Sequence, residues 1–147
     1  MKNKFMDEAF NEANKAFNLN EVPIGAIIVK DNKIIARAHN KKEQLNDVTR
    51  HAEIIAIQNA SKSLGDWRLN ECDMYVTLEP CIMCMGAIIQ SRISKLYIGT
   101  FNQEMGACGS IINLSDNRKI NCFVNTIWCN DVRCSELLSQ FFESRRR

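Results

Sequence analysis

Four residues in the middle of the chain are of the types that build a catalytic zinc site. His51 and Glu53 stand two positions apart, and a C-x-x-C pair formed by Cys81 and Cys84 follows. Catalytic zinc keeps three protein ligands and leaves its fourth position to water, whereas structural zinc is closed by four ligands. One histidine and two cysteines make three ligands, so these residues predict an open site with one Zn²⁺ per chain. Glu53 is close enough in sequence to move protons at the fourth position without binding the metal.

A C-x-x-C pair also has other uses. It can be a redox pair, half of a structural zinc site, or two small buried residues. A structural site would need a fourth ligand, and Cys72, Cys108 or His39 could supply it. None of these three stands in a paired ligand spacing. The upstream His-x-Glu and the proline directly before the first cysteine therefore favour the catalytic interpretation.

Length and composition indicate one domain spanning residues 1–147, with a substantial core. The net charge of +2 does not by itself indicate a nucleic-acid partner, although the chain ends in the basic run Arg145–Arg147. Seven cysteines without regular spacing predict free thiols in a reducing cytoplasm. We expect no cleavable leader and no membrane association, because the longest apolar run, 82–89, is far below the roughly 20 residues that span a bilayer.

Hydrophobic periodicity predicts a helix and a hairpin, followed by alternating helices and strands. Apolar residues three and four positions apart indicate amphipathic helices, and short apolar runs indicate buried strands. This order of elements predicts a three-layer α/β/α sandwich. Helices are expected over 3–18, over 50–60, from residue 80 onward and around 134–142, strands over 24–29, 33–39, 74–78, 95–99 and 123–126, and polar loops over 40–48 and 113–121.

Two of the predicted helices begin at the zinc motif. Asp47 or Thr49 could cap the helix that carries His-x-Glu in its first turn. Pro80 suits the start of the next helix, because its missing N–H costs nothing there. The two cysteines, at i and i+3, would then share one face of that helix. We therefore expect two positive helix ends at the metal, where they favour thiolate over thiol.

Together these residues resemble the cytidine-deaminase superfamily and, within it, the bacterial tRNA-specific adenosine deaminases. The pattern H-x-E…P-C-x-x-C is a signature of zinc-dependent nucleobase deaminases. The resemblance implies a five-stranded mixed sheet, a homodimer, and conversion of adenosine to inosine at the wobble position of a tRNA anticodon. It covers nearly the whole chain and rests on 22–26, Asn40, 51–54, 75–81, 83–84, 86–87, 91–93, 106–107, 109–110 and 141–146.

The resemblance also implies which residues hold the substrate. The Asn40 side chain and the Ala52 backbone N–H would hold the purine, and Glu53 would carry protons between water, ring and leaving ammonia. Asn102 would lie in a loop that meets the RNA. Relatives usually carry an aspartate there, so the uncharged amide predicts weaker discrimination between RNA and DNA.

Contacts with the RNA backbone are implied at two further places. Arg50 stands directly before the zinc-binding histidine, where an alanine is expected from the resemblance, and can face solvent or phosphate. Arg145 and Arg146 are candidate phosphate contacts at the end of the chain. Since a stacked base cannot be reached, the expected partner is an anticodon stem-loop with its target base splayed out.

The zinc motif alone fits other deaminases equally well. A free nucleobase or nucleoside deaminase acting on guanine, cytosine or cytidine is the alternative, and a non-catalytic zinc module that binds RNA is a more distant one. The flanking Gly-Ser turn and the Phe-Phe…Arg-Arg ending favour the tRNA enzyme. An intact Glu53 and a set of only three obvious ligands argue against the non-catalytic module.

Overall fold

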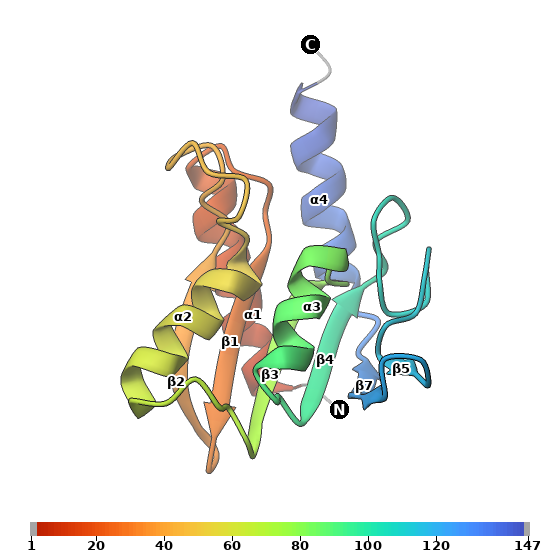
Figure 1. Cartoon of the computed structure of the whole chain (residues 1–147). Helices are drawn as coiled ribbons and strands as arrows, with labels where there is room; N and C mark the ends of the chain where they lie inside the picture. The colour runs from red at the N-terminus through yellow and green to blue at the C-terminus, as the bar shows by residue number, and fades with distance from the viewer. Residues whose placement is uncertain (1–2, 146–147) are drawn as a thin grey trace.

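A five-stranded mixed sheet forms the middle layer of the computed structural model, which describes residues 3–145 (Figure 1). The strand order is β2-β1-β3-β4-β7, with β1 antiparallel to both of its neighbours and the β3–β4 and β4–β7 pairs parallel. The fold class expected from the sequence is confirmed. The strands of this sheet are β1 (Gly25–Lys30), β2 (Lys33–His39), β3 (Cys72–Leu78), β4 (Lys95–Thr100) and β7 (Asn125–Trp128).

Two pairs of helices complete the sandwich. Helices α2 and α3 cover one face of the sheet, and α1 and α4 cover the other (Figure 1). Side chains of β1 alternate between the two cores: Ile28 packs under α2 and α3, whereas Ile27 and Val29 pack with Met6 of α1. The helices are α1 (Lys4–Asn18), α2 (Ala52–Leu64), α3 (Ile82–Gln90) and α4 (Val132–Arg145).

Helix α1 approaches the sheet very closely at Gly25. A Cβ atom at this position would collide with the carbonyl oxygen of Ala9 and the amide nitrogen of Ala13. Only glycine therefore allows α1 to lie directly on the first residue of β1.

The starts of α2 and α3 differ from the sequence prediction. Helix α2 begins at Ala52, with His51 at its N-cap, so neither Asp47 nor Thr49 caps it. Asp47 instead accepts hydrogen bonds from the backbone and hydroxyl of Thr49, at 2.9 and 2.7 Å, and closes a separate turn. Helix α3 begins at Ile82 with Cys81 at its N-cap, so Cys81 and the proline before it lie outside the first turn.

The last strand and the loop before it also differ from the sequence prediction. The strand that joins the sheet is β7, which lies two residues further toward the C-terminus than the predicted strand 123–126. The predicted polar loop 113–121 contains part of a small hairpin, in which β5 (Asp116–Asn117) pairs with β6 (Cys122–Phe123). Among residues 3–145, every helix is too short or too polar to cross a membrane.

Candidate metal centre and active site

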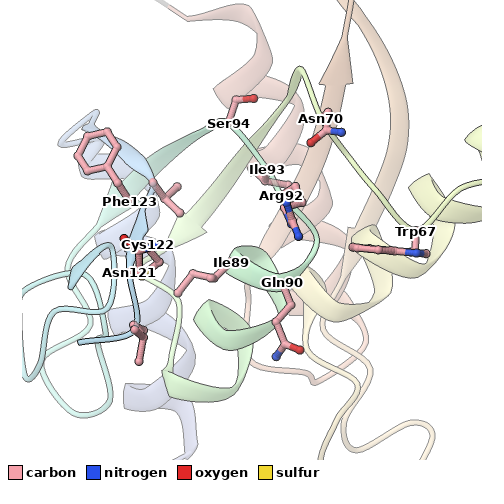
Figure 2. A pocket seen from close by; sticks show the side chains of 12 residues that line it. Trp67, Asn70, Ile89, Gln90, Arg92, Ile93, Ser94, Asn121, Cys122 and Phe123 are labelled. Atoms are coloured by element: carbon pink, nitrogen blue, oxygen red, sulfur yellow. The ribbon is translucent and has the colours of Figure 1, made fainter. Parts of the chain in front are cut away.

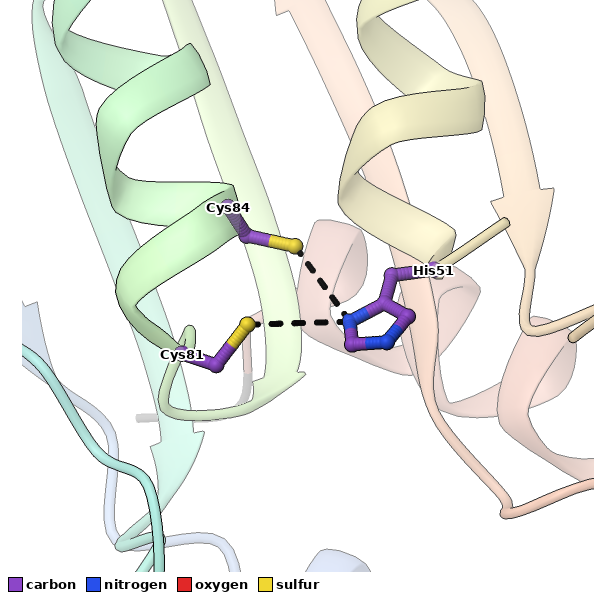
Figure 3. A group of neighbouring side chains, drawn as sticks. All are labelled: His51, Cys81 and Cys84. Atoms are coloured by element: carbon purple, nitrogen blue, oxygen red, sulfur yellow. Dashed lines mark hydrogen bonds between the residues drawn. The ribbon is translucent and has the colours of Figure 1, made fainter. Parts of the chain in front are cut away.

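Three side chains converge between the starts of α2 and α3 (Figure 3). Nδ1 of His51 lies 3.7 Å from Sγ of Cys81 and 3.5 Å from Sγ of Cys84, and the three atoms lie within 4.8 Å of one another. Tetrahedral zinc with bonds of about 2.3 Å to sulfur and about 2.05 Å to nitrogen would separate nitrogen from sulfur by about 3.6 Å. The donor set and the spacing therefore fit one Zn²⁺, and no second group of this kind occurs within residues 3–145.

The backbone at the two helix starts presents these side chains. His51 and Cys81 are both N-cap residues in extended conformation, with φ and ψ of −78° and 152° and of −76° and 178°. Neither side chain caps its own helix, so both are available to a metal. The first N–H of α2, from Ala52, donates instead to Oδ1 of Asn40 at 3.1 Å. The two groups expected to hold the purine are therefore in contact with each other, and Nδ2 of Asn40 is the remaining donor of that side chain.

The three side chains shift one another's pKa values. A hydrogen bond from the Cys84 thiol lowers the pKa of Cys81 to about 4, and the same hydrogen bond, together with burial, raises the pKa of Cys84. The hydrogen bond with Cys81 raises the pKa of His51. Zinc deprotonates the thiols that coordinate it, so binding of the ion would remove the proton of the Cys84 thiol.

Glu53 lies in the first turn of α2 and is only 3% exposed. Burial raises its pKa to about 7. Its Oε1 is buried and has no hydrogen-bond partner within residues 3–145. Buried polar atoms are nearly always paired, so an orphaned carboxylate oxygen beside three metal-type ligands indicates a place for water or substrate.

The loop that follows β4 contains Asn102. Oδ1 of Asn102 accepts hydrogen bonds from the backbone N–H of Glu104 at 3.2 Å and of Met105 at 3.1 Å. The side chain therefore shapes its own turn. Beside it, the ring of Phe101 stacks on Trp128 of β7, with ring centroids 4.8 Å apart.

Two of the predicted phosphate contacts interact with their own chain. The guanidinium of Arg50 pairs with Asp47 at 3.2 Å and donates to the side chain of Gln58, in the middle of α2, at 3.2 Å. Arg145 donates to the carbonyl oxygen of Asn20, and its guanidinium lies 4.6 Å from the centre of the Phe141 ring. Arg146, the third such residue, lies outside the described residues.

Sequence reasoning did not identify two buried carboxylates that shape the loops around the site. Glu21 accepts the backbone N–H groups of Glu43 and Gln44, at 3.1 and 2.5 Å, in the loop after Asn40. Glu79, directly before the P-C-x-x-C motif, is 1% exposed and bonds to the loop after β4. The position of Glu79 beside the motif was the one available signal, because neither residue has a recognisable partner nearby in sequence.

A separate surface pocket of about 960 Å³ lies at the C-terminal end of α3 (Figure 2). Ile89, Arg92 and Phe123 are among the residues that line it, and the Trp67 ring closes another side. The guanidinium groups of Arg68 and Arg92 lie 4.5 and 5.9 Å from the centre of that ring. This pocket shares no lining residue with the metal cluster, so it is distinct from the candidate active site.

Known proteins match the chain over almost its whole length. A tRNA-specific adenosine deaminase of Aquifex aeolicus (strain VF5) is 43% identical over 145 residues, which cover 99% of this chain and 96% of that protein. A solved structure from work on A-to-I editing by tRNA:A34 deaminases at the wobble position of transfer RNA has a TM-score of 0.88 at 39% identity. That match covers 92% of this chain and 99% of the other.

A guanine deaminase is also similar. The solved structure of this enzyme from Bacillus subtilis has a TM-score of 0.66 at 34% identity, and the match covers 100% of this chain and 96% of the other. The family model of the MafB19-like deaminases matches residues 1–146. On these matches and the metal-site geometry, the chain belongs to the MafB19-like deaminases and, among them, to the tRNA-specific adenosine deaminases.

Proposed function

We propose that this protein is a zinc-dependent hydrolase that converts adenosine to inosine at the wobble position of a tRNA anticodon. The observation that carries the proposal is the cluster of His51, Cys81 and Cys84 with a buried Glu53 beside it, whose Oε1 has no hydrogen-bond partner within residues 3–145, in a chain so similar to tRNA deaminases. Residues 1–147 would act as a single zinc-dependent deaminase domain. Seven free cysteines within residues 3–145 agree with a reducing, cytoplasmic setting.

The chemistry requires a water oxygen to bond to the ring carbon that carries the amine, and the bond from that carbon to nitrogen to break. Zinc held by His51, Cys81 and Cys84 would supply a water activated at neutral pH, because zinc lowers the pKa of bound water from about 15.7 to about 7. Glu53 takes one proton from this water and passes it to the ring nitrogen beside the reacting carbon. It then takes the second proton from the hydroxyl group now bonded to that carbon and delivers it to the amine, which leaves as ammonia while the carbon–oxygen bond becomes a carbonyl.

The surroundings of Glu53 suit this proton shuttle. A pKa of about 7 lets the carboxyl group both accept and return a proton near neutral pH. Its unpaired Oε1 has no competing partner within residues 3–145. The Asn40 side chain, fixed by its bond to the backbone N–H of Ala52, would hold the purine in place.

The direct test is to treat tRNA with the purified protein and to sequence it, since inosine is read as guanosine. Conversion at the wobble adenosine is the expected result. The guanine deaminase similarity makes a free-base or nucleoside deaminase the second candidate, so ammonia release from free guanine, cytosine, cytidine and adenosine is measured in parallel. Turnover of a free base without turnover of tRNA would favour that candidate, and a zinc-loaded protein inactive on every substrate would indicate a binding module.

A homodimer is part of the proposal, as the resemblance implies. Exposed apolar side chains on and beyond α3, including Ile82 at 50% and Phe123 at 72%, give such an assembly surface to bury. Light scattering coupled to size-exclusion chromatography should give a mass near twice 16.8 kDa. A mass of one chain at micromolar concentration would contradict this part.

The arginine ending provides a first test of RNA binding. If it contacts phosphate, removing residues 145–147 should weaken tRNA binding and lower the slope of log affinity against log salt by about 0.7–0.9 per lost contact. The rate at saturating tRNA should change little. A chain truncated after Arg145 is the matched control, because it keeps the bond from Arg145 to Asn20. If both truncated chains keep the wild-type slope of log affinity against log salt, the arginines at the end of the chain do not contact phosphate.

Asn102 provides a second test. An aspartate here would offer a charged acceptor to a ribose 2′-hydroxyl, and it would repel nearby phosphates of either nucleic acid. We therefore expect measurable deamination of a DNA copy of the anticodon loop by the wild-type protein, and a higher ratio of RNA to DNA turnover in Asn102→Asp. Single-turnover rates on both substrates give this ratio. A ratio that does not move would show that Asn102 acts only on its own turn, through the backbone of Glu104 and Met105.

A further inference from the structure

The loop of residues 101–110, called the 101–110 loop below, closes around one buried carboxylate. Glu79 stands at the end of β3, two positions before Cys81, and is 1% exposed. Its Oε1 accepts from the backbone N–H of Asn102 at 3.0 Å and from the hydroxyl of Ser110. Its Oε2 accepts from the backbone N–H groups of Cys108 at 2.8 Å and Ser110 at 3.2 Å. Four donors from both ends of the loop thus meet on a single side chain.

The backbone around Glu79 strengthens this attachment. The N–H of Glu79 donates to the carbonyl oxygen of Thr100 at 2.9 Å, and the N–H of Ala107 donates to the carbonyl oxygen of Pro80 at 2.9 Å. Gly106 packs against the carboxylate so closely that a Cβ there would lie 2.6 Å from Oε1 of Glu79. The loop is therefore folded directly onto the segment that leads into the metal-binding turn.

Partial loss of the hydrogen bonds between Glu79 and the 101–110 loop would be energetically costly. Hydrogen bonds to a charged carboxylate are stronger than neutral ones, and a buried carboxylate without partners is costly. The carboxylate of Glu79 has its partners only while the 101–110 loop stays in place. Movement of the loop relative to Cys81 would leave a buried charge without donors, so the two segments are held as one unit.

We propose that Glu79 is a positioning residue that fixes the 101–110 loop, with Asn102, relative to the metal-binding turn at Cys81. RNA that contacts the loop is thereby held in register with the base that reacts. Glu79 itself is buried behind the loop and does not reach the substrate. The proposal deepens the proposed function and rests on it, because it assigns the loop to RNA binding.

The test compares Glu79→Gln with a matched control. The amide keeps the size of the side chain but replaces one acceptor oxygen with a donor, which then faces N–H groups of the loop. Glu12→Gln makes the same change at another buried carboxylate, 4% exposed, whose partner is Lys15 at 2.6 Å on α1. Helix α1 covers the opposite face of the sheet from α2 and α3, which carry the metal site.

Two readouts separate positioning from simple destabilisation. Hydrogen exchange of the peptide covering 100–112 should become faster in Glu79→Gln and stay unchanged in Glu12→Gln. The KM for tRNA should rise about 10-fold in Glu79→Gln, with kcat changed less than about 3-fold and one zinc retained per chain. A variant that only loses folded protein would instead show a lower apparent kcat at an unchanged KM. Unchanged exchange, or an unchanged KM, overturns the proposal.

A second variant covers the case in which Glu79→Gln does not fold. Ser110→Ala removes one hydroxyl donor and leaves the carboxylate intact, so it should raise KM in the same direction by a smaller factor. An unchanged KM in this variant also overturns the proposal. The proposed function has its own test, because it is contradicted if the wild-type protein does not deaminate tRNA at all. In that case, hydrogen exchange of the peptide covering 100–112 still decides whether Glu79 anchors the loop.

Discussion

Replacing Glu53 with alanine should lower the turnover of tRNA by at least about 10²- to 10⁴-fold while zinc content and tRNA affinity stay close to those of the wild-type protein. The reason is the proposed division of roles, in which His51 and the two cysteines would bind the metal, whereas Oε1 of the Glu53 carboxylate has no hydrogen-bond partner within residues 3–145. Single-turnover deamination, metal analysis and a tRNA binding assay on the same preparation test this division.

Glu53→Gln is the control for the cavity that alanine would leave. It preserves the volume of the side chain but cannot carry the proton, so it should be as inactive as alanine and at least as stable as wild type in urea unfolding. Stability should hold because Oε1 of Glu53 has no hydrogen bond within residues 3–145 to lose. Loss of zinc stoichiometry in either variant would make Glu53 a ligand and contradict the assigned mechanism.

Replacing Cys84 with alanine should abolish both zinc binding and activity. Cys84 is fully buried at the start of α3, and its sulfur is one of only three donor atoms in the cluster. Because a metal that binds only the folded state stabilises it, the variant should also melt at a lower temperature and become insensitive to chelators. Metal analysis and thermal unfolding with and without a chelator measure the effect.

Cys72→Ala is the matched control, since Cys72 is another fully buried cysteine, at the start of β3 and outside the cluster. It should keep one zinc per chain and nearly full activity. Full activity in a thoroughly demetallated wild-type protein would contradict the metal-dependent mechanism altogether.

The cluster of His51, Cys81 and Cys84 could be predicted because the motif is short and the backbone around it is regular. The two cysteines are three positions apart at one helix start, and His51 with Glu53 occupies another, so local geometry already brings most of the site together. The layers of the fold were also predictable, since period-2 and period-3.6 patterns record which face of each element is buried. The predicted five strands and four helices are all present; β2 has the predicted bounds, and the others have one or both ends shifted.

The remaining differences come from interactions that no local pattern records. Asp47 and Thr49 are good cap residues, but the chain uses them in a turn and leaves the cap position to a metal-type ligand. The fifth strand is shifted because its place is set by parallel pairing with β4, from Asn125 onward. The role of Glu79 depends on a partner 31 positions away, Ser110, so it could not be read from the sequence around it.

The stacking of Phe101 on Trp128 gives the protein an intrinsic optical reporter. Trp128 belongs to the sheet, whereas Phe101 begins the loop that Glu79 anchors, so the surroundings of this indole change when the loop moves. The other tryptophan, Trp67, is 52% exposed and lies near the guanidinium groups of two arginines at the separate pocket. In a Trp67→Phe background, emission would therefore come from Trp128 alone. Docking of RNA at the loop could then be followed in real time, in stopped flow, without attaching a dye to either molecule.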